Sequence, residues 1–198
     1  MRRAWTRFWL SVSTVAIIGG VAMAVSAEKN HGAGARRHNE LTLAGLRPGR
    51  STISEALKKY KYAKRNGNED TLSSHDICFG QVLTITPDGD EIQAIRVSDD
   101  NGGHMTECLY RDEKRPANRW VTGHGLEIGN SDSRVIDLYG EPDSRSPSTK
   151  NGKPLELLYY AFDWAGPDVP QVMEVVCTRE KDGKPGRVVE ITLAAPSL

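Results

Sequence analysis

Two stretches of the chain space their apolar residues as one stripe of a short helix. The residues of the first stripe, at i, i+3, i+4 and i+7, are Ile53, Ala56, Leu57 and Tyr60. Those of the second stripe are Val135, Leu138 and Tyr139. This spacing places each set on one face of a helix. The pattern therefore predicts two short helices, one in each half of the chain.

Residues suited to helix ends flank both stripes. Ser51 or Thr52 stands where the first helix needs an N-cap oxygen, and Ser131 stands there in the second. Gly140 and Pro142 follow the second stripe and predict its end. The segment before each helix is also repeated, because GLRPGRS at 45–51 returns as GLEIGNS at 125–131.

Strand patterns follow each helix. The predicted strands span residues 81–86, 92–97, 155–162, 171–178 and 187–193. The first two flank a Pro-Asp-Gly-Asp turn and predict a hairpin, and the last three predict a meander. In the meander, alternation places Met173, Val175 and Cys177 on one face, opposite Val189, Ile191 and Leu193. We expect an α+β fold of two tandem units, each a short helix followed by an antiparallel β-meander, after an N-terminal signal segment.

Five segments follow from these patterns. Residues 1–27 form a signal peptide or anchor, and 28–40 form a flexible tether rich in glycine and charge. Residues 41–100 form the first helix-plus-sheet repeat, 101–120 form a connector, and 121–198 form the second repeat.

The N-terminus carries the pattern of an export signal. Arg2, Arg3 and Arg7 precede an uncharged run at 8–27 that ends in the small residues Val-Ser-Ala. We expect cleavage after Ala27 and a periplasmic or secreted protein. An uncleaved run of this length would instead anchor the chain in the inner membrane.

Composition excludes several classes of protein. The 198 residues include 26 basic and 26 acidic side chains, so overall charge does not favour binding to nucleic acid. Hydrophobic residues are 38 %, which fits a globular protein and not a multi-pass membrane protein. The sequence contains no nucleophile elbow, HExxH helix, P-loop or dinucleotide fingerprint, and we expect neither catalytic residues nor a cofactor.

The repeated unit resembles a known superfamily. Its pattern is Leu-x-x-Gly-x-Ser, a short helix, Tyr-Gly-x-Pro, an aromatic strand and a hairpin ending in Val-Val-x-Ile, with the closest match at Gly129, Gly140 and Pro142. This pattern resembles the SmpA/OmlA (BamE-like) lipoproteins of outer-membrane assembly and the β-lactamase inhibitor protein. The resemblance implies a non-enzymatic protein-binding module of the bacterial cell envelope.

The three cysteines permit two arrangements. Cys78 and Cys108 flank the first predicted hairpin and would form a disulfide in an oxidising compartment, while Cys177 alternates with core positions as a buried thiol. Alternatively, His75, Cys78, His104 and Cys108 have the spacing of a zinc site. The second function we consider is accordingly a metal- or thiol-dependent hydrolase that uses these four residues.

One strand suggests where another protein would bind. The strand at 155–162 is apolar on both faces, and we expect Leu155, Leu157, Tyr159 and Ala161 to pack on the helix of its own repeat. The opposite face, with Tyr160, Phe162 and the nearby Trp164, would then contact the first repeat or a protein partner. We predict these three aromatic residues as the protein-binding site.

The cysteine assignment predicts a thiol count. Because Cys78 and Cys108 would be bridged and Cys177 buried as a thiol, titration of the unfolded, unreduced protein should find one free group. Three free groups would contradict the disulfide, and a peptide map that links Cys177 would show a different pairing.

Overall fold

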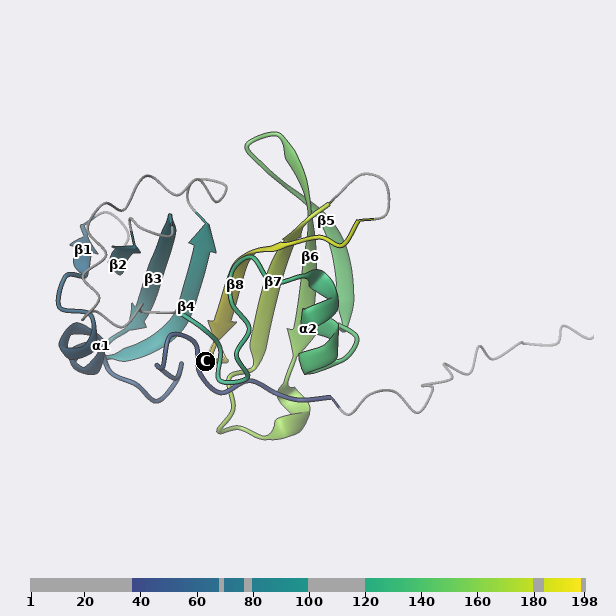
Figure 1. Cartoon of the computed structure of the whole chain (residues 1–198). Coiled ribbons are helices and arrows are strands. Elements are labelled where there is room, and N and C mark those ends of the chain that lie inside the picture. The colour runs from purple at the N-terminus through teal and green to yellow at the C-terminus, as the bar shows by residue number, and fades with distance from the viewer. Residues whose placement is uncertain (1–36, 68–69, 77–79, 100–119, 180–183, 197–198) are drawn as a thin grey trace, which may run out of the picture. The chain divides into compact units, whose positions relative to one another are not determined.

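The computed structural model describes residues 37–67, 70–76, 80–99, 120–179 and 184–196 (Figure 1). Its helices are α1 (Ile53–Lys59), α2 (Asp132–Tyr139) and the short 3-10 helix η1 (Asp163–Ala165). Its strands are β1 (Lys64–Asn66), β2 (Thr71–Asp76), β3 (Gln81–Asp88), β4 (Glu91–Asp99), β5 (Ser144–Lys150), β6 (Lys153–Ala161), β7 (Val172–Thr178) and β8 (Val188–Ala194).

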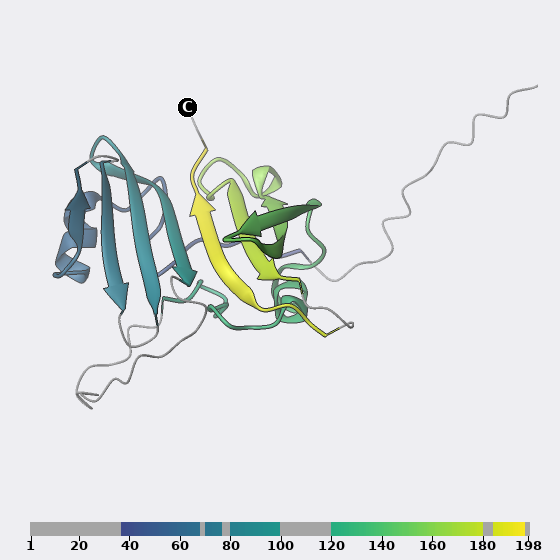
Figure 2. The same cartoon turned by 90° about the horizontal axis from the view of Figure 1, so that it is seen from above.

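The strands of the described residues form one antiparallel sheet. Their order across this eight-stranded sheet is β1-β2-β3-β4-β8-β7-β6-β5. The two halves of the chain meet where β4 pairs with β8, in a register that runs from Ala94 opposite Ala194 to Ser98 opposite Glu190. Figure 2 shows these two strands side by side.

The prediction of an α+β fold with two tandem helix-plus-meander units is wrong. The chain folds as a β-rich protein in which two short helices accompany one continuous sheet. The physical reason lies in β4 and β8, which would each leave a row of backbone N–H and C=O groups unpaired at the edge of a separate sheet. Pairing β4 with β8 satisfies both rows, and alternation of side chains does not reveal which strand has an open edge.

The core lies on one face of this sheet. Register places the central buried side chains of neighbouring strands beside one another. These side chains are Leu72, Leu83, Ile85, Ile95, Val97, Ile191, Leu193, Met173, Val175, Leu158 and Tyr160. Both helices bury residues in the same cluster, through Ile53 and Ala56 of α1 and Val135 and Tyr139 of α2. The two halves therefore share one hydrophobic core.

The predicted helices and their caps agree closely with the structure. Thr52, not Ser51, caps α1, since it accepts a hydrogen bond from the backbone of Glu55 in a capping box. Ser131 caps α2 by accepting from the backbone of Arg134. Leu57 was expected on the buried stripe of α1 but is 43 % exposed.

Three strands were not predicted, because their sequences are polar. Most side chains of β1 and β5 are exposed, and β2 combines buried Thr71 and Leu72 with more exposed residues. Pro147 lies inside β5, at the edge of the sheet. Proline has no backbone N–H and is tolerated in strands mainly at edges, which agrees with the position of β5.

Two assignments of side chains to faces in the meander are wrong. In β6 the face packed on α2 carries Leu158 and Tyr160, not Leu157 and Tyr159. The register between β7 and β8 shifts at Cys177, which lies opposite buried Val188 instead of Val189. A bulge of this kind moves every later side chain to the other face, so alternation alone cannot place them.

The first described residues, 37–46, form a strap that crosses from the second half of the fold to the first. In Figure 1 the strap is the purple segment that runs past α2 toward α1. Ala44 donates its backbone N–H to Val121, and Gly123 donates to Thr42. Leu43 and Leu46 are buried in the core. The predicted tether at 28–40 therefore ends in residues that pack against the fold.

Several predicted segments lie outside the described residues. These are the signal segment 1–27, most of the tether 28–40 and the connector 101–120 apart from buried Trp120. Within the described ranges, no helix has the length and apolar character needed to cross a membrane.

A shared core predicts that both halves unfold together. Ile191 is completely buried between Val97 and Val175, so Ile191→Ala should lower the free energy of unfolding by about 2–4 kcal/mol. Calorimetry should show a single transition at a lower temperature. Val189→Ala on the same strand is the control and should have a smaller effect. Two separate transitions would contradict a shared core.

Candidate functional site

A fully buried carboxylate lies at the centre of the main polar cluster. The Oε1 atom of Glu40 accepts the backbone N–H groups of Leu41 and Thr42, at 2.7 and 3.0 Å. Its Oε2 atom accepts the backbone N–H of His124 at 3.1 Å and the Tyr139 hydroxyl at 2.7 Å, and contacts Nδ1 of His124 at 3.0 Å. Both carboxylate oxygens are thus saturated with hydrogen bonds.

The environment of this cluster shifts two pKa values. Burial alone would raise the pKa of Glu40, but the hydrogen bonds from Thr42, Tyr139 and His124 outweigh burial and lower it. Burial, followed by the negative charge of Glu40, raises the pKa of Tyr139. Glu40 is therefore charged and Tyr139 neutral across the physiological pH range.

The arrangement fits an anchor better than a catalytic site. A histidine that is oriented by a carboxylate resembles part of a general-base system, and the His124 side chain is 40 % exposed. However, the Tyr139 hydroxyl already bonds both Glu40 and Thr122. Gly123 packs so closely that an added Cβ would lie 2.5 Å from Oε1 of Glu40. The cluster therefore fastens the strap to α2 and to the segment 122–126.

The sequence patterns do not predict this cluster. Glu40 is the last residue of the predicted tether, Tyr139 lies on the second helical stripe, and no pattern in the sequence singles out His124. The available signal was the sequence Glu-Leu-Thr-Leu at 40–43, in which apolar positions begin immediately after the carboxylate. Nothing in the spacing links residue 40 to residues 124 and 139.

Aromatic rings connect the cluster to the predicted binding residues. Successive ring centroids from His124 through Tyr139, Tyr160 and Phe162 to Trp164 lie 5.7, 5.9, 6.3 and 6.4 Å apart. Tyr160 and Phe162 are both 2 % exposed, whereas Trp164 is 52 % exposed. Of the three residues predicted to bind protein, only Trp164 offers a surface, and the binding role itself stays a prediction.

The described residues include only some of the cysteines and histidines of the predicted disulfide and zinc site. Cys78, His104 and Cys108 lie outside the described residues, so the disulfide and the zinc alternative both stay predictions. His75 is exposed on β2. Cys177 is a buried free thiol, as expected, and burial raises the pKa of its thiol to about 12. Among the described residues, no group of three or more potential ligands has the geometry to hold a metal ion.

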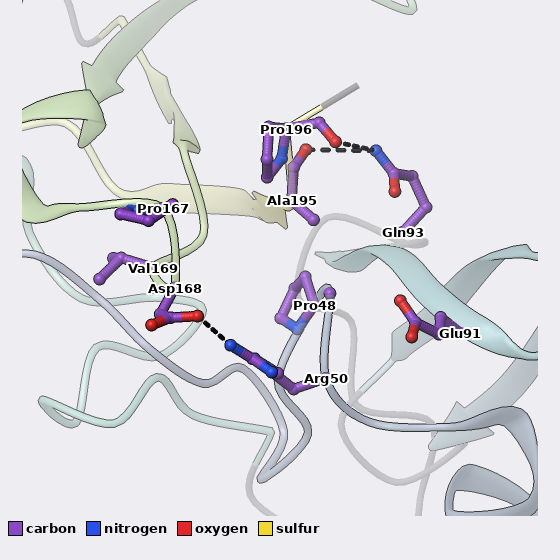
Figure 3. A pocket seen from close by; sticks show the side chains of 10 residues that line it. Pro48, Arg50, Glu91, Gln93, Pro167, Asp168, Val169, Ala195 and Pro196 are labelled. Carbon is purple, nitrogen blue, oxygen red and sulfur yellow. Dashed lines mark hydrogen bonds and ion pairs between the residues drawn. The ribbon is translucent and has the colours of Figure 1, made fainter. Parts of the chain in front are cut away.

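A small cleft lies between the two halves of the fold (Figure 3). Its volume is about 170 Å³, and its lining includes Pro48, Arg50, Gln93, Asp168 and Pro196. Arg50 forms an ion pair with Asp168, and Gln93 donates to the carbonyl oxygens of Ala195 and Pro196 at 3.2 and 3.1 Å. These polar groups already bind one another. They hold the two sides of the cleft together and offer little to a ligand.

The face of the sheet opposite the core is a further candidate surface. We call this the open face, because neither described helix packs against it. One row across it contains Thr84, Arg96, Thr192, Glu174 and Tyr159, and the next contains Val82, Ser98, Glu190, Val176 and Leu157. Ala94, Ala161, Val172 and Ala194 form a third row. All of its apolar and tyrosine side chains are half-buried.

The β5–β6 hairpin shields one border of the open face. Lys150, beside the turn, reaches across to Glu190 of β8, with Nζ and Oε2 3.4 Å apart. Leu155 lies on the open-face side of β6, yet its side chain is only 5 % exposed. The centre of the open face, on β3, β4, β8 and β7, carries Arg96 and Glu174 without an ion-pair partner among the described residues.

Comparisons with known proteins give only distant structural likenesses. No protein-family model and no curated protein matches the sequence. A cysteine-rich secretory protein from Staphylococcus aureus subsp. aureus Mu50 is 12 % identical, with a TM-score of 0.42 over 81 % of this chain and 49 % of its own. A Streptococcus mutans protein, provisionally named a β-lactamase inhibitor protein, is 17 % identical, with a TM-score of 0.24 over 78 % of this chain and 89 % of its own.

These likenesses are too weak to assign a family or a function. The chain spans about half the length of the secretory protein. The sequence resembles both the β-lactamase inhibitor protein and the BamE-like lipoproteins. The first resemblance has one weak structural neighbour, and no family model supports the second.

The buried carboxylate predicts a pH-dependent stability. Because hydrogen bonding lowers the pKa of Glu40 in the folded protein, its contribution is present at neutral pH and is lost as the pH falls below about 4. Glu40→Gln should cost roughly 3 kcal/mol at pH 7, because an amide nitrogen would face backbone donors. The difference in melting temperature from wild type should shrink at pH 3.

The control for this experiment is Glu141→Gln. Glu141 is 72 % exposed and pairs with Arg145 on the surface, so its loss should cost less than about 1 kcal/mol. Equal and pH-independent effects of the two substitutions would contradict an anchoring role for Glu40.

Proposed function

We propose that the chain is an exported, non-enzymatic protein-binding module whose partner binds the open face. The observation that carries this proposal is the composition of that face. Half-buried Leu157, Tyr159, Val172 and Val176 lie beside one another there, on rigid strands and among polar side chains. A mixture of tyrosine and aliphatic side chains within a polar border is typical of protein interfaces.

Rigidity also favours this surface. The strands of the open face are held by the shared core on the opposite side, so binding would not require ordering of a loop. The basic start, uncharged run and small-residue end of residues 1–27 support export. The anchoring geometry of the Glu40 cluster supports a scaffold more than a catalyst.

Trp164 is a second candidate for the contact. Its exposed indole packs edge-on against buried Phe162, with centroids 6.4 Å apart, which holds the ring in place. A pre-positioned tryptophan is a common hot spot in protein interfaces. The two candidates are distinguishable, because Trp164 lies in η1 and Tyr159 on β6.

Paired substitutions test the proposed surface. Affinity capture from the native envelope identifies the partner, and its dissociation constant is then measured for each variant. Tyr159→Ala should weaken binding about tenfold or more, because central tyrosines contribute on the order of 2 kcal/mol. The melting temperature should change little, since Tyr159 lies outside the shared core.

Tyr62→Ala is the matched control, because this tyrosine is 77 % exposed in the loop between α1 and β1. It should leave the dissociation constant unchanged. If Trp164→Ala abolishes binding and Tyr159→Ala does not, the partner binds at η1 and the proposed surface is wrong.

A further inference from the structure

Two histidines lie side by side where the strap meets the segment 122–126. The rings of His38, on the strap, and His124 have centroids 5.8 Å apart, and their planes are inclined at 48°. His38 is exposed, and the side chain of His124 is 40 % exposed. The pair therefore forms the solvent-facing end of the cluster whose buried end is Glu40.

Glu40 determines which nitrogen of His124 is free. A charged carboxylate only accepts hydrogen bonds, so Nδ1 of His124, 3.0 Å from Oε2 of Glu40, carries the proton that it donates. In the neutral ring, Nε2 is then unprotonated and keeps its lone pair. Nε2 has no hydrogen-bond partner among the residues that the structure describes. A histidine whose second nitrogen donates to a carboxylate is the common form of a histidine metal ligand.

The ring of His124 is held in place before any ion binds. Tyr139 packs against it edge-on, with centroids 5.7 Å apart, and the backbone N–H of His124 donates to the same Oε2 atom of Glu40 at 3.1 Å. A ligand that is already ordered loses less conformational entropy on binding. The ring of His38 makes no hydrogen bond with a described residue, so it is able to turn toward an ion beside His124.

We propose that His38 and His124 together bind a zinc ion or another divalent transition-metal ion that prefers imidazole ligands. With a metal–nitrogen distance of about 2.1 Å and a ring centre about 1.1 Å further on, two imidazoles that share one ion have centroids about 5–6 Å apart. The observed separation of 5.8 Å lies in this range. Water would complete the coordination, because no group of three potential ligands occurs in the described part of the chain.

The charges around the pair are compatible with a cation. Glu40 places a negative charge directly behind His124, and the guanidinium of Arg37, next to His38 in the sequence, is bound to Asp143 at 2.8 Å. The ion would connect the strap to the segment 122–126 and so add to the anchoring by Glu40. With two protein ligands, we expect a dissociation constant in the micromolar range, weaker than that of a structural site with four protein ligands.

Zinc titration of the exported chain tests the proposal. Zinc should raise the melting temperature of wild type, because the two histidines are close together only in the folded protein. His38→Ala should raise the zinc dissociation constant at least tenfold, since it removes one of the two protein ligands. His124→Asn should do the same, because its amide still offers Glu40 a donor but has no Nε2. Melting temperatures without zinc establish that both variants fold.

Histidine ring ¹⁵N spectra locate the bound ion. Zinc should shift the ring signals of both His38 and His124. The signals of His124 should show a metal on Nε2 and a proton still on Nδ1, facing Glu40. If saturating zinc leaves both sets of ring signals unchanged, the proposal is overturned.

His75→Ala is the matched control, because His75 is also exposed but lies on β2 and belongs to the alternative zinc site predicted with Cys78, His104 and Cys108. It should leave the zinc-induced shifts of His38 and His124 unchanged. Zinc that shifts the ring of His75 and not those of His38 and His124 binds at the alternative site, and the pair proposed here is then wrong.

Discussion

The pairing of β4 with β8 is the contact on which the rest of the structure depends. It joins two groups of strands into one sheet, and one sheet has only two faces. Both helices bury their apolar side chains on the same face, so the apolar surface of each half contributes to one shared core. Neither helix of the described residues packs on the opposite face. The open face spans both halves because the two halves combine through their edges.

The strap supplies a second connection between the halves, of a different chemical kind. Its leucines contribute to the core, while Glu40 places a negative charge in a site with 0 % exposure. Burial of a charge is unfavourable unless hydrogen bonds compensate, and here five groups from the strap, α2 and segment 122–126 do so. Such an arrangement tolerates few alternatives, because each missing partner leaves a buried group unsatisfied. These hydrogen bonds thus hold the strap in one position against the rest of the fold.

The sequence predicted local structure well and long-range structure poorly, for identifiable reasons. Caps such as Ser131 depend on a few neighbouring residues, and the β3–β4 hairpin depends on its turn, so both are readable from a short window. The pairing of β4 with β8 depends on residues about one hundred positions apart, and alternation carries no information about it. A separation of 84 positions likewise hid the contact of Glu40 with His124. Polar strands such as β5 were missed because strand propensity describes half-buried surfaces, and this edge is exposed.

Pro147 has a consequence for the outer edge of the sheet. An exposed edge strand offers its free backbone donors to any other extended chain, which is how sheets grow from molecule to molecule into fibrils. Proline removes one donor near the middle of β5, and the charged side chains of Arg145 and Lys150 lie on the same strand. A foreign strand could not form a continuous ladder there. β5 is thus a poor template for a further strand, and growth of the sheet from this edge is disfavoured.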